Sequence, residues 1–190
     1  MQNIREYQGQ LLNHFEAVYR PGDRAHARAF LTALGLYVED YSNPDPASDK
    51  MLGIHFNPED RDATNNLIFL HKMSEPQAKF DALLRTKLAD DVELAEAHGQ
   101  FQDTVARYPG ATPHFGIRYR SMEALDRVIE RLDAVSDELK RRVTVTEMPP
   151  YPPYPGMPDI RQVFVQSDVI STSPAGFGQT IELQVERPPA

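Results

Sequence analysis

A short motif in this chain returns one hundred residues later. Residues 13–20 read NHFEAVYR and residues 113–120 read PHFGIRYR, so His, Phe, Tyr and Arg hold the same four places. In both halves a segment with helical periodicity follows, and each half closes on a short strand-like segment, 67–70 in the first and 180–183 in the second. Such a duplication constrains the architecture more than any single residue does. It also places His14 and His114 at equivalent points of two similar modules, where a two-fold arrangement can bring them together.

The first module, residues 10–73, predicts the order β-α-β-β-β. A strand is expected over 11–19, and Gly22 and Asp23 then offer the start of a helix that ends at Gly35. Three further strands are expected at 36–41, 52–57 and 67–72. A proline-containing turn at 43–46 and a polar stretch at 58–66 separate them.

The second module, residues 113–187, predicts the same order. A strand over 114–120 leads to a helix capped by Ser121, whose apolar stripe runs to Leu132 and extends toward Leu139. Strands are expected at 142–147, 163–166 and 180–185. Six of the sixteen prolines lie in 149–158, which predicts a stiff loop. Tyr151 and Tyr154 in this loop either close a cavity or pack over a sheet edge.

Residues 74–112 interrupt the repeat and predict a helical insert. Ser74-Glu75-Pro76 is a typical helix start. A second helix is expected from about 91 to 106. The first helix carries an apolar stripe, formed by Phe80, Leu83, Leu84 and Leu88. We expect this stripe to cover one sheet face or to line a subunit contact, and we expect a homodimer.

The composition narrows the classes of function. The net charge of −8 argues against a nucleic-acid partner, and the one dense basic cluster, 140–142, suits a solvated helix terminus. The chain has no cysteine, which excludes disulfides, thiolate nucleophiles and Cys-based zinc sites. No apolar run has the length of a signal peptide or a membrane helix, so a soluble, cytoplasmic protein with no membrane contact is expected.

Three segments carry a resemblance to a known superfamily: 23–36 (DRAHARAFLTALGL), 113–132, and 176–183 (GFGQTIEL). With a histidine on the first strand of each module and a glutamate on the last, the chain resembles the vicinal oxygen chelate superfamily. That superfamily includes glyoxalase I, extradiol dioxygenases, fosfomycin-resistance transferases and bleomycin-resistance proteins. The resemblance covers the chain except the insert. It implies an α+β fold of two tandem β-α-β-β-β modules.

The resemblance also implies a metal site with one ligand from the first and last strand of each module. The matching positions hold His14, Phe69, His114 and Glu182. Phe69 cannot bind a metal, so a two-histidine, one-glutamate set remains, as in the dioxygenase and fosfomycin-resistance branches. Such a set suits Fe(II) or Mn(II), with Ni, Co or Zn as alternatives, and leaves room for a substrate with two adjacent oxygens. Thr172 stands where the dioxygenases have an active-site tyrosine, so the likeness to that branch ends at the metal.

Residues two apart on a strand share a face, which adds neighbours to this site. Glu16 is a candidate general base beside the metal, or else an ion-pair partner of Arg118 or Arg20. Arg118 would clamp an anionic substrate, or form a surface salt bridge. Gln184 would line the substrate pocket together with Phe69. His71 would line it or replace the missing ligand, although a hydrogen-bonded strand histidine is the simpler interpretation for His71 and also for His55.

Three classes of function follow. The leading hypothesis is a metal-dependent enzyme that chelates a small-molecule substrate, with dioxygenase-like oxidation favoured over isomerase, lyase or transferase chemistry. The alternative is a metal-free binding protein of the bleomycin-resistance type, and an interaction protein comes third. In the metal hypothesis, His14, His114 and Glu182 converge on a common point. The Phe69 ring then occupies the opposite side of the pocket.

Overall fold

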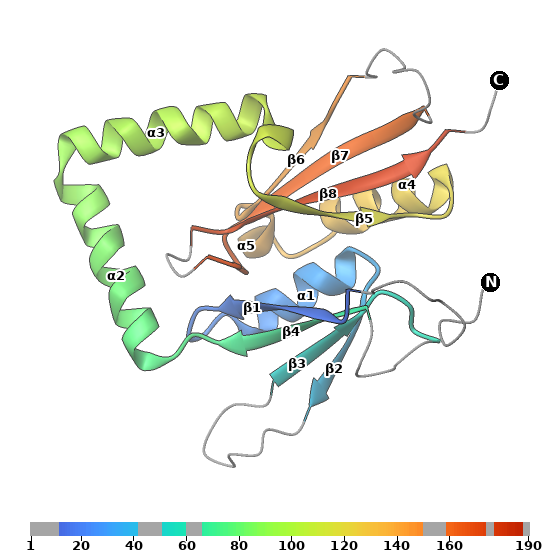
Figure 1. The fold of residues 1–190 in the computed structure, drawn as a ribbon, viewed down its shortest axis with the longest axis horizontal. Helices are drawn as coiled ribbons and strands as arrows, with labels where there is room; N and C mark the ends of the chain where they lie inside the picture. The colour runs from blue at the N-terminus through green and yellow to red at the C-terminus, as the bar shows by residue number, and fades with distance from the viewer. Residues whose placement is uncertain (1–11, 42–50, 60–65, 150–158, 174–176, 188–190) are drawn as a thin grey trace.

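The computed structural model describes residues 12–41, 51–59, 66–149, 159–173 and 177–187. These residues form two four-stranded mixed sheets that are connected by a pair of helices (Figure 1). The strand order is β1-β4-β3-β2 in one sheet and β5-β8-β7-β6 in the other. In each sheet the first strand of the module lies parallel to the last. The predicted α+β fold of two tandem β-α-β-β-β modules with a helical insert is confirmed.

The first module follows the predicted order closely. Its elements are β1 (His14–Tyr19), α1 (Arg24–Ala33), β2 (Tyr37–Tyr41), β3 (Met51–His55) and β4 (Leu67–Lys72). Helix α1 buries the stripe that contains Phe30 and Leu31 and ends at Gly35. Gly35 has a φ of 83°, a left-handed conformation that glycine adopts without strain. The predicted turn at 43–46 lies outside the described residues.

The second module differs from the prediction in two elements. It consists of β5 (His114–Arg118), α4 (Met122–Asp133), α5 (Asp137–Lys140), β6 (Val143–Glu147), β7 (Ile160–Ser167) and β8 (Gln179–Glu186). The stripe expected to extend toward Leu139 is broken, because the Ser136 hydroxyl accepts a hydrogen bond from the Leu139 amide and starts α5 anew. Strand β7 has eight residues rather than four. The predicted loop with Tyr151 and Tyr154 lies outside the described residues.

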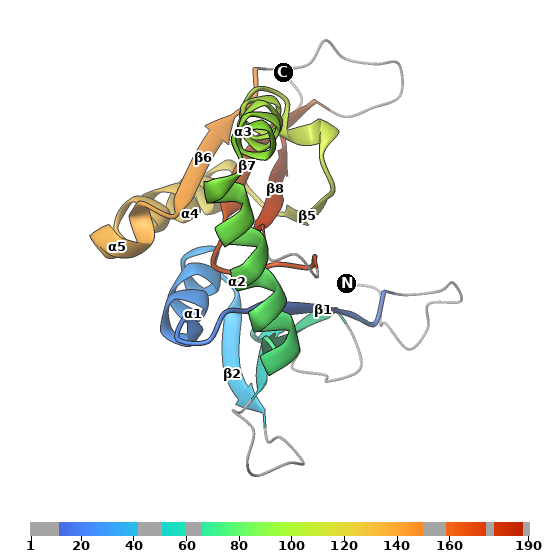
Figure 2. The same ribbon diagram turned by 90° about the vertical axis from the view of Figure 1, so that its left-hand side faces the viewer.

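The insert forms an arch beside the two sheets (Figure 1), and Figure 2 shows its helices in front of them. It contains α2 (Glu75–Asp90), α3 (Val92–Arg107) and a short 3-10 turn, η2 (Pro109–Ala111). Asp81 is the only buried residue of α2, and Val105 is the only one of α3. Phe80 and Leu83 are 52% and 58% exposed, so these two side chains of the stripe do not cover a sheet face. The alternative, a subunit contact, stays a prediction.

The two modules share one hydrophobic core. Helices α1 and α4 pack against each other behind the sheets, and the core cluster includes side chains from both modules. The Phe15 and Phe115 rings, at equivalent places in the repeat, lie 4.7 Å apart between their centroids. The backbone of Val18 exchanges two hydrogen bonds with Ser171, at 2.8 and 2.9 Å. The repeat therefore folds as two copies joined along β1 and β5.

Candidate functional site on the open sheet faces

The strand register supports the equivalence of the two modules. Glu16 of β1 lies opposite Phe69 of β4, and Gly116 of β5 lies opposite Glu182 of β8. Residue 116 follows residue 16 by one repeat length, so Phe69 and Glu182 occupy corresponding positions. One module thus carries a phenyl ring where the other carries a carboxylate, as the sequence comparison of the two halves predicts.

His114 and Glu182 form a close pair in the second module. Nε2 of His114 lies 3.3 Å from Oε2 of Glu182, and their side chains are 23% and 8% exposed. Nδ1 of His114 donates a hydrogen bond to the backbone oxygen of Thr112, at 2.7 Å. A carbonyl oxygen only accepts, so this contact fixes Nδ1 as the protonated nitrogen and directs Nε2 to the carboxylate.

Neighbouring amides hold the Glu182 carboxylate in place. Oε1 of Glu182 accepts hydrogen bonds from the side-chain amides of Gln162 on β7 and Gln184 on β8, the latter at 2.7 Å. The Phe164 ring meets the imidazole of His114 edge-on, with the centroids 5.5 Å apart. A carboxylate offers about four acceptor positions. Two described amides donate to this one, both to Oε1, and Oε2 faces Nε2 of His114. When Nε2 of His114 carries no proton, Oε2 of Glu182 is left to accept a hydrogen bond from a ligand.

The contact between His114 and Glu182 is favourable only when a positive charge lies at Nε2 of His114. With the proton on Nδ1, a neutral His114 would point a lone pair at the Glu182 carboxylate, which is repulsive. A second proton on Nε2, or a cation between the two groups, makes the contact favourable. The pair is therefore suited to hold a proton or a positive charge at Nε2 of His114.

A second polar cluster lies on the first module. Glu16 is its centre: Oε2 lies 2.8 Å from Nε2 of His71, and Oε1 lies 3.7 Å from Nε2 of His14. All three side chains are 40–54% exposed. The structure thus gives Glu16 histidine partners, whereas Arg118 pairs with Glu186. Of the two interpretations of Arg118, the surface salt bridge is the one that the structure contains.

Aromatic rings border this second cluster. The Phe69 ring lies 5.0 Å from the His14 ring and 5.9 Å from the Tyr41 ring, between centroids. Nε2 of the buried His55 contacts both the Tyr41 hydroxyl and the Glu39 carboxylate, each at 2.9 Å. The interpretation of His55 as a hydrogen-bonded strand histidine is confirmed.

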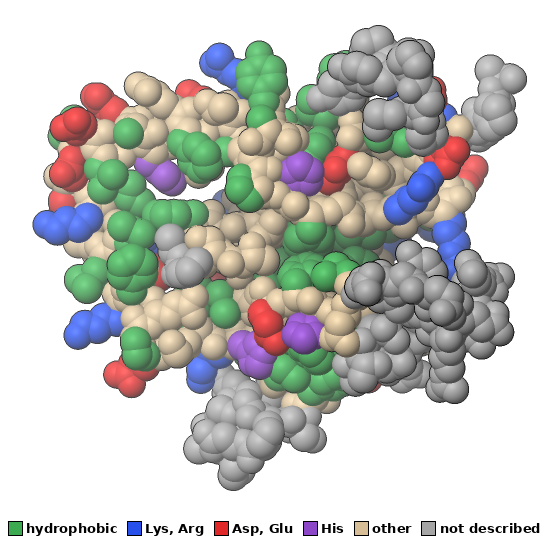
Figure 3. All heavy atoms as spheres, viewed as in Figure 1, with side chains coloured by type: hydrophobic (Ala, Val, Ile, Leu, Met, Phe, Trp, Pro, Cys, Tyr) green, Lys and Arg blue, Asp and Glu red, His purple; other side chains and the backbone are tan. Residues whose placement is uncertain are grey.

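The predicted three-ligand metal site is not assembled. Among the described residues, which include all three predicted ligands, no group of three His, Cys, Asp or Glu side chains is arranged to hold a metal ion. His114 and Glu182 meet, but His14 faces Glu16 on the other sheet. Figure 3 shows histidine and acidic side chains at two separate places on this face, with hydrophobic side chains between them. The residues as placed do not fit a complete two-histidine, one-glutamate centre.

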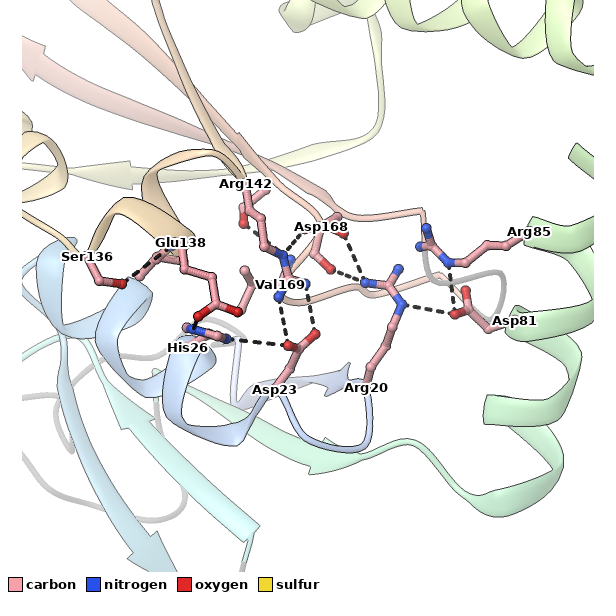
Figure 4. Close-up of polar contacts among 12 residues, drawn as sticks. Arg20, Asp23, His26, Asp81, Arg85, Ser136, Glu138, Arg142, Asp168 and Val169 are labelled. Atoms are coloured by element: carbon pink, nitrogen blue, oxygen red, sulfur yellow. Dashed lines mark hydrogen bonds and ion pairs between the residues drawn. The ribbon is translucent and has the colours of Figure 1, made fainter. Parts of the chain in front are cut away.

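A network of ion pairs between the modules was not predicted from the sequence (Figure 4). Arg142 donates to both carboxylate oxygens of Asp23, at 2.7 and 2.8 Å, and to Asp168 at 2.7 Å. The Arg142 guanidinium holds the pKa of Asp23 below its ordinary value. Arg20 joins the same network through Asp168 and Asp81. The interpretation of 140–142 as a solvated helix terminus is therefore wrong for Arg142.

His26 also belongs to this network. Its ring nitrogens lie 3.5 Å from Asp23 and 3.5 Å from Glu138, so it joins α1 to α5. The residues in the network are up to 148 positions apart in the chain. No local pattern in the sequence relates residues at such distances, which is why the network was missed.

Comparisons with known proteins give structural neighbours only. No family model matches the sequence, and no curated protein is detectably related to it. A glyoxalase/bleomycin resistance protein/dioxygenase from Alicyclobacillus acidocaldarius is similar at 12% identity and a TM-score of 0.43, over 99% of this chain and 96% of its own. A hypothetical protein from S. aureus is 13% identical, with a TM-score of 0.44, over 94% of this chain and 99% of its own.

A protein from Pseudomonas aeruginosa is 10% identical, with a TM-score of 0.45, over 95% of this chain and all (100%) of its own. The fold itself is defined by the strand order and register given above. Within the described residues, no helix has the length and apolar character needed to cross a bilayer.

Proposed function

We propose that the protein binds a small molecule on the open faces of its two sheets, with the His114–Glu182 pair as the polar anchor. The observation that carries this proposal is the construction around Glu182, a nearly buried carboxylate held by two amides and one imidazole. Burying a charge costs free energy unless the charge is paired. A nearly buried carboxylate on a strand therefore favours a functional role. The remaining acceptor position faces the partly exposed His114.

The chemistry of the surface favours an aromatic ligand with a positively charged or hydrogen-bond-donating group. Glu182 accepts such a donor. The second cluster, around Glu16, adds a negative charge to the same face, and the partly exposed Phe69 ring beside it offers a flat apolar contact. This is the metal-free binding function that the sequence offers as its alternative.

Tyramine, a small aromatic ammonium, is a suitable probe. We expect calorimetric titration to give saturable binding with a dissociation constant on the order of 1 mM. Glu182→Gln should weaken binding about tenfold, because a charged hydrogen bond is lost. Glu130→Gln, on the exposed side of α4, removes the same charge far from the site and should leave affinity unchanged. Equal affinity of wild type and Glu182→Gln would exclude Glu182 as the anchor.

A second candidate function is the divalent-metal chemistry that the sequence resemblance implies. One observation favours it: Nδ1 of His114 is bound to Thr112, which leaves Nε2 directed at Glu182. This is how metal-binding histidines are commonly oriented. His14 contacts Glu16 instead, so no reaction step is derived through a metal.

Titration with Mn(II) and Ni(II) separates the two candidates. Stoichiometric binding that is lost in His14→Gln, His114→Gln and Glu182→Gln alike would place the metal enzyme first. Oxygen uptake with catechols or turnover of 2-oxoaldehydes would then distinguish dioxygenase from isomerase chemistry. Binding that is unaffected by His14→Gln would reject the predicted three-ligand set.

A further inference from the structure

A cavity lies beside the His114–Glu182 pair, where the insert passes over the second sheet, and its lining includes Thr112, which accepts the hydrogen bond from His114. Its volume is about 540 Å³, within the usual size of small-molecule sites. It is lined by α3, by the neighbouring ends of β6, β7 and β8, and by the segments that lead into β5 and β8. Neither His114 nor Glu182 lines it. The cavity exists because the insert interrupts the repeat, and the first module has no counterpart of α3.

The charges in the cavity lining leave one cation without a partner among the described residues. Three lining residues are charged: Arg141, Arg142 and Asp168. Arg142 is held by Asp168 and by Asp23, so its charge is compensated. Arg141 forms no ion pair with a described residue, which gives the lining a net charge of +1 in a chain whose net charge is −8. The cavity is therefore suited to an anion.

One wall of the cavity is apolar and aromatic. Phe101 and Val105 come from α3, and Phe177 comes from the segment before β8. Phe101 and Phe177 are among the large hydrophobic side chains left exposed, at 52% and 37%. The Phe177 ring also lies against the His98 ring of α3, 5.4 Å between centroids. Two exposed rings at one cavity provide flat surfaces for an aromatic ligand.

The rest of the lining is rich in uncharged hydrogen-bonding groups. It contains hydroxyl and amide side chains, namely Thr112, Thr144, Gln166, Ser173, Gln179 and Thr180. The Gln166 amide donates to the backbone oxygen of Val105 at 3.1 Å, which holds α3 over the cavity. The side-chain oxygen of Gln166 is left to accept a hydrogen bond from a ligand hydroxyl.

We infer that this cavity binds a small hydroxylated aromatic carboxylate. Its carboxylate pairs with Arg141, its ring lies against Phe101 and Phe177, and its hydroxyl group meets the polar part of the lining. This site uses none of the residues that anchor the proposed ligand on the open sheet faces. The two proposals therefore stand or fall separately.

Salicylate and its uncharged analogue salicylamide test the inference by calorimetric titration of the full chain. Salicylate is expected to bind saturably, and salicylamide at least about tenfold more weakly. Arg141→Gln should reduce salicylate affinity about tenfold and bring it close to that of salicylamide. Arg120→Gln, which removes an exposed arginine outside the cavity, is the matched control and should leave affinity unchanged.

Two further variants locate the binding site. Phe101→Ser removes a half-exposed ring and should weaken both ligands to a similar degree, since its contribution does not depend on charge. Glu182→Gln should bind salicylate as the wild type does, because Glu182 and the side chains that contact it lie outside the lining. The inference is overturned if salicylate does not saturate, if salicylamide binds equally well, if Arg141→Gln has no more effect than Arg120→Gln, or if Glu182→Gln abolishes binding.

Discussion

At the scale of single residues, two glycines with similar backbone conformations have different surroundings. Gly178 precedes β8 with a φ of 103°, and a Cβ atom there would lie 2.6 Å from the backbone oxygen of Ser167. Gly22 precedes α1 with a φ of 94°, and nothing lies within 4 Å of its hypothetical Cβ. Both positions disfavour other residues through φ, but only Gly178 is confined by neighbouring backbone.

We expect Gly178→Ala to lower the free energy of unfolding by about 2–4 kcal/mol, because the backbone must shift to relieve the clash with Ser167. Gly22→Ala should cost about 1 kcal/mol, from backbone strain alone. Urea denaturation of the two variants beside the wild type measures the difference. Equal losses would show that the segment before β8 adapts freely to the added methyl group.

At the scale of elements, the insert leaves apolar side chains exposed that the rest of the described chain does not bury. Helices α2 and α3 together bury two residues, although helices in proteins owe most of their stability to the packing of an apolar face. Phe80 and Leu83 lie on the surface of α2. Burial of these side chains by a second copy of the chain would supply the missing stabilisation.

We therefore expect the wild type to form a homodimer in sedimentation equilibrium at tens of micromolar concentration (roughly the range of weak specific interfaces). The double variant Phe80→Ser, Leu83→Ser should be monomeric under the same conditions. Val145→Ser, which removes another exposed apolar side chain on β6, should not change the association state. A monomeric wild type, or a double variant that still dimerises, would contradict this expectation.

The elements that the sequence predicted well are those with short-range signals. The stripe of α1 and its stop at Gly35, and the Ser74 and Ser121 caps, are patterns within a few residues, and the structure contains each of them. The equivalence of Phe69 and Glu182 followed from the repeat, and the strand register agrees with it.

The features that were missed depend on long-range packing or on side-chain orientation. Strand β7 was predicted too short, because Arg161 and Gln162 are polar residues in an extended segment. Strand periodicity does not predict whether His14 turns toward Glu16 on its own strand or toward His114 and Glu182 of the other module. The position of α3 over the second sheet, which creates the cavity, leaves no periodic signal in the chain.

At the scale of the whole molecule, the ion-pair network joins both modules and the insert. Asp23 belongs to the first module and Arg142 to the second, with both side chains about four-fifths buried. Hydrogen bonds from the Arg142 guanidinium hold the pKa of Asp23 below its ordinary value of 3.8. A carboxylate with a lowered pKa stabilises the folded state above the unfolded pKa, and this contribution is lost as the pH falls through the folded one.

We expect Asp23→Asn to lower the free energy of unfolding by about 1–3 kcal/mol at neutral pH, since it leaves Arg142 with one carboxylate partner. The difference from the wild type should shrink as the pH falls below about 4, because Asp23 of the unfolded chain takes up a proton there and the folded carboxylate does so only at a lower pH. Asp133→Asn, at an exposed pair with Lys140, should cost less than about 0.5 kcal/mol. Urea denaturation at pH values from about 3 to 7 covers the carboxylate titration. A difference in the free energy of unfolding between Asp23→Asn and the wild type that does not depend on pH would contradict the assignment.

The end of helix α1 receives hydrogen bonds from the other module. The Tyr119 hydroxyl donates to the Leu34 carbonyl at 2.7 Å, and Nε of Arg131 donates to the Ala33 carbonyl at 2.9 Å. Both donors come from the second module. The end of α4, by contrast, receives its hydrogen bond from within that module, because Nζ of Lys140 donates to the Asp133 carbonyl. The two halves are thus no longer interchangeable. A chain assembled from two first halves would keep a tyrosine at the place of Tyr119, but it would have Leu31 at the place of Arg131 and would lose that donor to the helix end.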